Sequence, residues 1–267
     1  MKYKILCSDL DGTLLSSKSD VSKFAIEQIG KIKDDTKIIL VSARMPSGMH
    51  YIQENLGITN QPIICYNGAL VLAGNKTLTS VCIPINILTD IHKLCKGFEA
   101  DLGLYYKNEW YVPKTSLRVE KETKYTKSTP TFQDTDNTLD NWEQRKVGAH
   151  KIMLMCTKAS ADTLMPILKD KLGEALNLYR SNDTLIEIAP KTVSKLSAIK
   201  LLLKENDALK DIIAFGDNYN DIEMLENVGC GVAVFNARDE VKAISNAITL
   251  ENTEDGVAYY IAENLVN

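Results

Sequence analysis

The segment KILCSDLDGTLL, residues 4–15, constrains the fold of this chain more than any other segment. In it an apolar run ends at two carboxylates, Asp9 and Asp11, which one residue separates. Side chains two residues apart lie on the same face of a strand, so both carboxylates are expected to point at one small volume. Gly12 then permits a sharp turn, because glycine adopts backbone angles that other residues avoid. An ordinary Asp-Gly turn after a strand would look the same, and the rest of the chain has to decide between the two interpretations.

A pair of carboxylates this close predicts a cation site. Two neighbouring anions repel each other, and one of them is neutralised unless a cation or a proton lies between them. Oxygen ligands in a confined space suit Mg²⁺, which readily shares its coordination shell with the phosphate of a substrate. The first hypothesis for this segment is therefore a magnesium site at the end of a strand.

Strands that are apolar on both faces alternate with amphipathic helices at both ends of the chain. This alternation predicts a doubly wound, mostly parallel sheet, in which ligands bind beyond the carboxyl ends of the strands. After the first strand, further strands are expected at residues 37–41, 62–66, 211–215 and 231–234, and helices at residues 21–34, 46–56, 193–204, 222–228, 241–244 and 257–265.

The pattern changes between residues 84 and 188, which predicts an inserted α+β domain of about a hundred residues. Helices are expected at residues 85–98 and 161–175, and strands at 102–106, 109–112, 151–156, 178–180 and 184–188. Residues 116–140 are polar and show too little periodicity to predict any element. The expected organisation is a catalytic core of residues 1–83 and 189–267 that is interrupted by this insert.

Further polar residues follow the core strands at the end where Asp9 and Asp11 lie. Ser42 ends the strand at 37–41, and its hydroxyl could hold a phosphoryl oxygen. Arg44 is as compatible with a surface charge as with a role in the pocket. Asn67 ends the strand at 62–66 and is either a substrate contact or a turn residue with left-handed backbone angles.

The segment GDNYND, residues 216–221, forms a second acidic cluster after a strand and at the start of a helix. Asp217 or Asn218 could simply cap that helix, but a cap needs one polar side chain and this turn has four. Together with Asp9 and Asp11, Asp217 and Asp221 would complete a magnesium site made of oxygen ligands. Lys195 lies in the first turn of another expected helix, where an isolated lysine is usually solvated. A phosphate site with four carboxylates needs such a cation.

The composition excludes several classes of protein. Of the 267 residues, 31 are Lys or Arg and 35 are Asp or Glu, and the net charge of −4 argues against general nucleic-acid binding. No apolar stretch reaches the length of a membrane span, and no apolar leader precedes the first strand. The six cysteines form no CxxC pair and are expected to be reduced thiols. A cytoplasmic protein, monomeric or a small homo-oligomer, that acts on a small metabolite is expected.

Four segments resemble, in chain order, the four motifs of the haloacid dehalogenase superfamily: residues 9–15 (DLDGTLL), residues 42–44 (SAR), Lys195 and residues 216–221 (GDNYND). The insert between the second and third motifs resembles the α/β cap of type IIB found in the Cof-type subfamily, which includes sugar phosphatases. The second motif departs from the usual Thr-Gly-Arg but keeps its hydroxyl. In the third, Leu196 replaces the glycine that usually follows the lysine.

The resemblance implies a Mg²⁺-dependent phosphatase whose substrate is a small phosphorylated metabolite, in particular a sugar phosphate. It implies that Asp9 is the nucleophile that forms an aspartyl-phosphate and that Asp11 is the general acid and base. It also implies roles for two larger groups of residues. The metal would be held by Asp9, the backbone carbonyl of Asp11, Asp217 and Asp221, and the substrate phosphate would be bound by Gly12, Ser42, Arg44, Asn67, Lys195 and Asn220.

Two other functions remain open from the sequence. A phosphotransferase or sugar phosphomutase would use the same aspartyl-phosphate and pass the phosphoryl group to a hydroxyl. A phospho-accepting signalling module also has an acidic magnesium pocket and an acceptor aspartate, although the large insert and the acid at Asp11 argue against it.

Overall fold

The structure of the chain is a computed structural model that describes residues 3–16, 19–74 and 76–266, and it divides into two compact units. Residues 1–78 and 194–267 delimit the core unit, and residues 79–193 form the insert. The insert thus starts at Thr79 instead of residue 84 and ends at Val193 instead of residue 188. Backbone hydrogen bonds explain this, because Ile83 pairs with Ala149 and the N–H of Lys191 donates to the carbonyl of Ala175.

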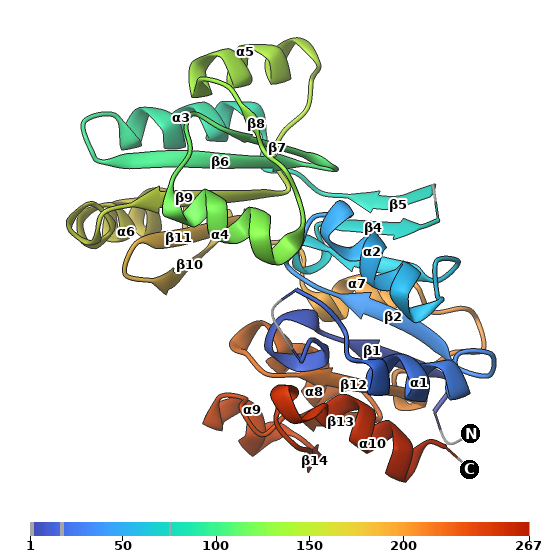
Figure 1. Cartoon of the computed structure of the whole chain (residues 1–267). Helices are drawn as coiled ribbons and strands as arrows, with labels where there is room; N and C mark the ends of the chain where they lie inside the picture. The colour runs from blue at the N-terminus through green and yellow to red at the C-terminus, as the bar shows by residue number, and fades with distance from the viewer. Residues whose placement is uncertain (1–2, 17–18, 75, 267) are drawn as a thin grey trace. The chain divides into compact units, whose positions relative to one another are not determined.

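The core unit is built on a sheet in the order β14-β13-β12-β1-β2-β3-β4-β5 (Figure 1). Strand β1 lies between β12 and β2 and is parallel to both, with Cys7 opposite Ala214 on one side and Ile39 on the other. The six parallel strands are β1 (Ile5–Ser8), β2 (Lys37–Val41), β3 (Pro62–Cys65), β12 (Ile212–Gly216), β13 (Cys230–Ala233) and β14 (Ala247–Ile248). The antiparallel edge consists of β4 (Leu70–Ala73), which pairs with β3, followed by β5 (Lys76–Ser80).

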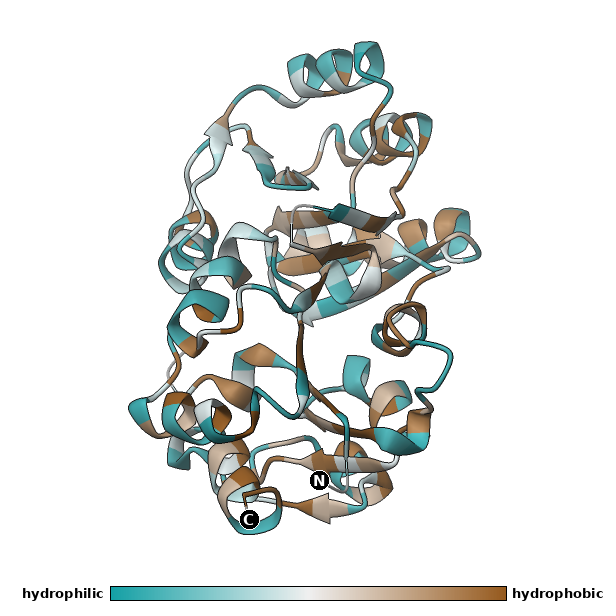
Figure 2. Cartoon of the chain, turned by 90° about the vertical axis from the view of Figure 1, so that its right-hand side faces the viewer, coloured by the Kyte–Doolittle hydropathy of each residue, from teal (hydrophilic) through white to brown (hydrophobic). Residues whose placement is uncertain are grey.

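Helices cover this sheet in two groups. Helix α1 (Lys23–Ile32) packs against α2 (Ser47–Leu56) and α10 (Gly256–Asn264), whereas α7 (Lys195–Leu201) packs against α8 (Ile222–Asn227), which also contacts α9 (Asp239–Ile244). Five of the parallel strands are buried along almost their whole length, as a sheet covered on both faces requires, whereas the two-residue edge strand β14 is not buried. Figure 2 shows the same distribution, with hydrophobic residues concentrated in the strands and mixed colours along the helices. The expected doubly wound α/β core is confirmed.

The insert contains a second sheet, in the order β10-β11-β9-β6-β7-β8, that is mostly antiparallel. Its strands are β6 (Ala100–Tyr106), β7 (Glu109–Val112), β8 (Thr131–Phe132), β9 (Lys151–Cys156), β10 (Leu176–Asn182) and β11 (Leu185–Pro190). Helices α3 (Ile85–Cys95), α5 (Thr135–Gln144) and α6 (Lys158–Leu172) share one hydrophobic cluster with alternate residues of the strands, such as Leu102 and Leu104 of β6. The alternation leaves residues such as Tyr105 and Lys151 on the other face. The predicted inserted α+β domain is therefore confirmed.

Residues 116–140, for which the sequence predicts no element, contain helix α4 (Leu117–Thr126), strand β8 and the start of α5. The hydroxyl of Ser116 caps α4, of which only Val119 and Thr126 are buried, so its apolar stripe is too thin to detect. Helix α5 buries four residues with helical spacing: Thr135, Thr138, Leu139 and Trp142. Two of these four are threonines, which a search for hydrophobic periodicity does not count.

The structure describes two features on which the sequence makes predictions, the cysteines and the length of the apolar helices. All six cysteines are free thiols, and Cys82 and Cys156 are only partly buried. Within residues 3–16, 19–74 and 76–266, no helix has both the length and the apolar character that crossing a membrane requires.

Candidate active site

Asp9 lies directly after β1, at the carboxyl ends of the parallel strands. Strand β1 ends at Ser8, and the N–H of Asp9 donates to the carbonyl of Phe215 in β12, 3.1 Å away. The side chain of Asp9 is almost fully buried, and its Oδ1 accepts a hydrogen bond of 2.6 Å from Nζ of Lys195. The centre of the sheet therefore presents one carboxylate at its carboxyl edge, as the sequence predicts.

Asp11 does not share a strand face with Asp9, so that part of the sequence prediction is wrong. After Ser8 the chain enters a helical turn, Leu10–Leu14, in which Asp11 and Gly12 have non-helical backbone angles. Hydrogen bonds from the N–H groups of Leu14 and Leu15 back to Asp9 and Leu10 close this turn. The two-residue alternation of a strand therefore ends before Asp11, and its carboxylate turns to Arg44 instead.

The second acidic cluster follows β12 and places Asp217 and Asp221 beside Asp9. Oδ2 of Asp221 accepts the N–H groups of Asp217 and Asn218, both at 3.0 Å, which fixes the buried carboxylate at the start of the following helix. One ligand atom from each of Asp9, Asp217 and Asp221 lies within 4.8 Å of the others. The two acidic segments predicted from opposite ends of the chain do converge.

Lys195 is the cation of this cluster. It is the first residue of α7, it is buried, and its Nζ lies 2.6 Å from Oδ1 of Asp9 and 2.6 Å from Oδ1 of Asp221. Burial opposes the charged lysine, but the attraction of Asp221 and Asp9 outweighs it and raises the pKa of Lys195. Helix α7 can approach this closely because Gly68 lies against the backbone of Ser194, where a Cβ would be only 2.4 Å from the carbonyl oxygen.

The electrostatics of the cluster favour the binding of a further cation. Burial raises the pKa of Asp9 well above its usual value, and the positive charge of Lys195 partly offsets this shift. The pKa of Asp217 is raised to about 6, mainly by burial and also by repulsion from Asp221. Three carboxylates against one lysine leave two negative charges uncompensated. Buried carboxylate oxygens in this number fit a hard divalent cation.

Thr13 and Gly12 shape the turn around Asp217. The hydroxyl of buried Thr13 donates to Oδ1 of Asp217 at 2.9 Å. Gly12 has φ of 86°, and a Cβ at this position would lie 2.8 Å from Oδ2 of Asp217. The carbonyl of Gly12 accepts a hydrogen bond from Asn236, which no sequence signal singles out. Thr13 belongs to the first motif, but its role was missed because its partner is distant in sequence.

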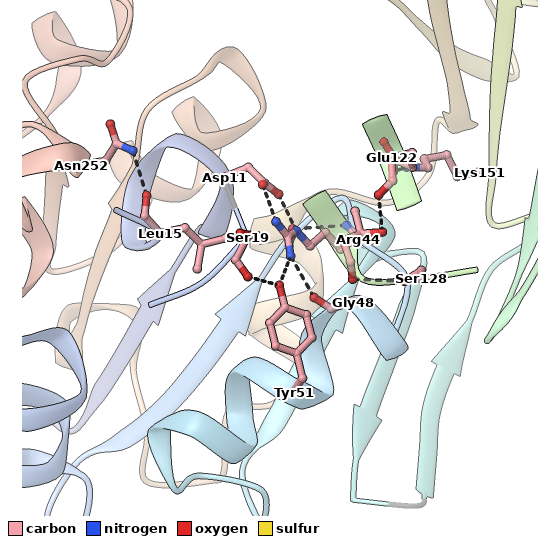
Figure 3. Close-up of polar contacts among 12 residues, drawn as sticks. Asp11, Leu15, Ser19, Arg44, Gly48, Tyr51, Glu122, Ser128, Lys151 and Asn252 are labelled. Atoms are coloured by element: carbon pink, nitrogen blue, oxygen red, sulfur yellow. Dashed lines mark hydrogen bonds and ion pairs between the residues drawn. The ribbon is translucent and has the colours of Figure 1, made fainter. Parts of the chain in front are cut away.

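Arg44 binds Asp11 with two parallel hydrogen bonds, from Nε to Oδ2 at 2.8 Å and from Nη2 to Oδ1 at 2.6 Å (Figure 3). The guanidinium is buried, whereas half of the Asp11 side chain is exposed. Of the two sequence interpretations of Arg44, the surface charge is wrong. The hydroxyl of Ser42 is buried and accepts the N–H of Arg44 at 3.2 Å.

Asn67 and Asn220 form a polar pair near the same strand ends. Nδ2 of Asn220 donates to Oδ1 of Asn67 at 3.1 Å, and the N–H of Asn67 donates to the carbonyl of Ser42 at 2.9 Å. Asn67 has φ of 54°, so it adopts the left-handed conformation, which is one of the two interpretations that the sequence allows. That conformation does not exclude a substrate contact, which stays a prediction. The structure thus gathers all the predicted site residues of the core at this edge, and their chemical roles stay predictions.

Comparisons with known proteins show the family of the chain. The model of the haloacid dehalogenase-like hydrolase family matches residues 6–261. A Haemophilus influenzae protein is 31% identical over 98% of both chains, and pyridoxal phosphate phosphatase YbhA of Escherichia coli is 26% identical over the full length of both. The crystal structure of a haloacid dehalogenase-like hydrolase from Bacteroides thetaiotaomicron superposes with a TM-score of 0.89 at 25% identity, covering 98% of this chain and 99% of that one. The chain therefore belongs to the family of haloacid dehalogenase-like hydrolases.

Proposed function

We propose that this hydrolase is a Mg²⁺-dependent phosphatase that cleaves the phosphate ester of a small metabolite, most specifically a sugar phosphate. The observation that carries the proposal is the convergence of Asp9, Asp217 and Asp221 around the ammonium group of Lys195. The name of the E. coli relative, a pyridoxal phosphate phosphatase, supports a small phosphorylated substrate. The insert, as a cap domain, would select the substrate.

In the first step a carboxylate oxygen of Asp9 attacks phosphorus, and the bond from phosphorus to the ester oxygen breaks. Asp11 gives its proton to the departing oxygen, so the alcohol leaves and an aspartyl-phosphate remains. In the second step Asp11 takes a proton from water, and the water oxygen attacks phosphorus. The bond from phosphorus to Asp9 breaks, inorganic phosphate leaves, and both carboxyl groups return to their starting forms.

The other site residues would bind and orient the phosphoryl group. The hydroxyl of Ser42, the ammonium of Lys195, the N–H of Gly12 and the amides of Asn67 and Asn220 supply the donors. Asp9, Asp217, Asp221 and the carbonyl of Asp11 would hold Mg²⁺. When bound, the metal neutralises charge between the nucleophile and the phosphate. Lys195 keeps Asp9 in place through its hydrogen bond to Oδ1.

Phosphate release from a panel of phosphate esters, with and without Mg²⁺, tests the proposal. Asp9→Asn should abolish turnover while the circular dichroism spectrum stays unchanged. Asp239→Asn is the matched control, because that side chain is fully exposed on α9. Hydrolysis by Asp9→Asn at the wild-type rate would refute the mechanism. Transfer of phosphate to an added sugar would instead indicate a phosphotransferase, and a long-lived phosphoprotein without multiple turnover would indicate a signalling module.

A further inference from the structure

We propose that Arg44 and Tyr51 are positioning residues, which hold the carboxyl group of Asp11 in the orientation from which its protonated form gives its proton to the leaving group. This inference rests on the proposed phosphatase function and assigns Arg44 a different role from the phosphate ligand that the family resemblance implies. Three sets of contacts, all within the core unit, carry it, and Figure 3 shows the first two.

The first set fixes Asp11 relative to Arg44. The guanidinium meets both carboxylate oxygens at 2.8 and 2.6 Å, and this two-point geometry selects one orientation of the carboxylate. Asp11 needs such a partner because 49% of its side chain is exposed and the turn around it has irregular backbone angles. An exposed aspartate without a rigid partner would exchange between several rotamers.

The second set fixes Arg44 itself. Nη1 donates to the carbonyl of Gly48 at 3.1 Å and to the hydroxyl of Tyr51 at 2.9 Å, both on α2. The hydroxyl of Tyr51 in turn donates to the carbonyl of Ser19 at 2.6 Å. The guanidinium is thus attached to a helix and, through Tyr51, to the loop that follows the turn of Asp11. A planar guanidinium held at several N–H groups has little freedom to rotate.

The third set connects this arrangement to the phosphate site. The N–H of Arg44 donates to the hydroxyl of Ser42, so Ser42 and the guanidinium that holds Asp11 belong to one short segment after β2. A direct bond from the guanidinium of Arg44 to the phosphate would compete with the hydrogen bonds that its N–H groups donate, including the two to Asp11. Direct phosphate binding by Arg44 is the alternative that the experiment has to exclude.

The chemistry of the leaving group separates the two roles. An alkoxide needs protonation as it departs, whereas p-nitrophenolate leaves readily without it, so only alkyl esters depend strongly on the acid. The ratio kcat/KM covers the steps up to departure of the leaving group and therefore reports this difference. A lost phosphate ligand would weaken both kinds of ester and inorganic phosphate alike.

The experiment compares Arg44→Lys and Tyr51→Phe with the wild type on p-nitrophenyl phosphate and on the best alkyl phosphate from the panel. Arg44→Lys should lower kcat/KM for the alkyl ester about a hundredfold, because a misplaced catalytic group costs this much, and for p-nitrophenyl phosphate less than about threefold. Tyr51→Phe, which keeps the ring in place, should act in the same direction by about five- to tenfold. The inhibition constant of inorganic phosphate should stay within about twofold of the wild type in both variants.

Arg145→Lys is the matched control. Arg145 also meets a carboxylate at two points, with its Nη1 and Nη2 on Glu109 of the insert, and its replacement should leave the ratio of the two substrates unchanged. Equal losses on both esters together with weaker phosphate inhibition would overturn the inference in favour of direct phosphate binding. Unchanged kinetics in both variants would overturn it as well. If the wild type hydrolyses neither ester, the proposed function fails instead, so the two failures are distinguishable.

Discussion

Among the residues that the structure describes, each unit buries one lysine near two carboxylates, but the two lysines differ in their distances to those carboxylates. In the core, Nζ of Lys195 lies 2.6 Å from both carboxylates, and the three side chains are at most 9% exposed. In the insert, Nζ of Lys151 lies 4.0 Å from Glu122 and 3.8 Å from Glu187, whose side chains are 16% and 29% exposed. Removing one partner of a buried, closely paired ion pair strongly destabilises a protein, because the other charge stays buried without compensation. Removing one partner of an exposed pair costs little, because water solvates the remaining charge.

The two units also differ in how they treat other buried ionisable groups. The core brings three carboxylates together and compensates them with a cation. The insert keeps its buried histidine neutral: Nδ1 of His150 accepts the N–H of Lys107, and Nε2 lies 2.9 Å from the hydroxyl of Ser80. Burial, together with repulsion from Lys107, lowers the pKa of His150 to about 4. Concentrated charge is therefore a feature of the core, and four experiments test this contrast.

The largest effect is expected for Lys195→Met, which leaves two carboxylates buried without their cation. The free energy of unfolding should fall by about 3–5 kcal/mol, and turnover of phosphate esters should be lost. Urea denaturation followed by circular dichroism measures the first effect. Lys200→Met is the control on the same helix, and it should change stability by less than about 0.5 kcal/mol because Lys200 is exposed. A similar loss in both variants would remove the distinction between paired and solvated lysines.

Acid should destabilise the insert through His150. The unfolded chain binds a proton below about pH 6.5, whereas the folded insert binds it only near pH 4, so stability falls as the pH drops between these values. The expected total is about 3 kcal/mol. Both tryptophans of the chain, Trp110 and Trp142, lie buried in the insert, so urea titrations followed by tryptophan fluorescence report on this unit.

A variant without the imidazole isolates the contribution of His150 to this acid sensitivity. His150→Gln should flatten the dependence of stability on pH between 4 and 6.5, whereas His50→Gln in α2 of the core should preserve it. If the dependence persists in His150→Gln, other groups cause it and the insert does not depend on a neutral histidine.

A smaller effect is expected for Thr13→Val, which keeps the shape of the side chain and removes the hydroxyl that donates to Asp217. The Mg²⁺ concentration required for half-maximal activity should rise about ten- to hundredfold, as is typical when a partner of a metal ligand is lost. Thr249→Val is the control, because its hydroxyl donates to the carbonyl of Gly256. An unchanged Mg²⁺ requirement in Thr13→Val would show that Asp217 does not need this support.

The smallest effect is expected for Lys151→Met. Its contacts with Glu122 and Glu187 are 4.0 and 3.8 Å long and the glutamates are partly exposed, so the free energy of unfolding should fall by about 1 kcal/mol or less. Tryptophan fluorescence during urea denaturation gives the value. A loss as large as that of Lys195→Met would break the comparison between the two lysines.

Much of the site follows from the sequence because strand ends and charge can be read directly. Asp9 and Asp217 each follow an apolar run, and the rule that parallel strands share a carboxyl edge brings them together. The position of Lys195 at the start of a core helix is also informative, although Leu196 replaces the usual glycine. The strand model for Asp11 was wrong, because an alternation rule cannot detect that β1 ends at Ser8.

The contacts that complete the site could not be predicted, because they join residues that are far apart in the chain. Thr13 and Asp217 are 204 positions apart, and Asn236 and Gly12 are 224 apart. No local pattern indicates that Tyr51 bridges Arg44 and Ser19. In the insert, α4 and α5 escaped detection because threonines occupy buried positions and because α4 buries little.

By itself the sequence determined the class of fold, the insertion and the acidic groups that meet at one edge of the core sheet, since hydrophobic period and strand-end chemistry are local properties. The tertiary structure alone decided which carboxylate faces which cation: Asp9 lies against Lys195, and Asp11 lies against Arg44. The physical reason is that a side chain's partner depends on how turns and helices pack, and at this site the irregular turn Leu10–Leu14 begins between the two neighbouring carboxylates, which face different cations.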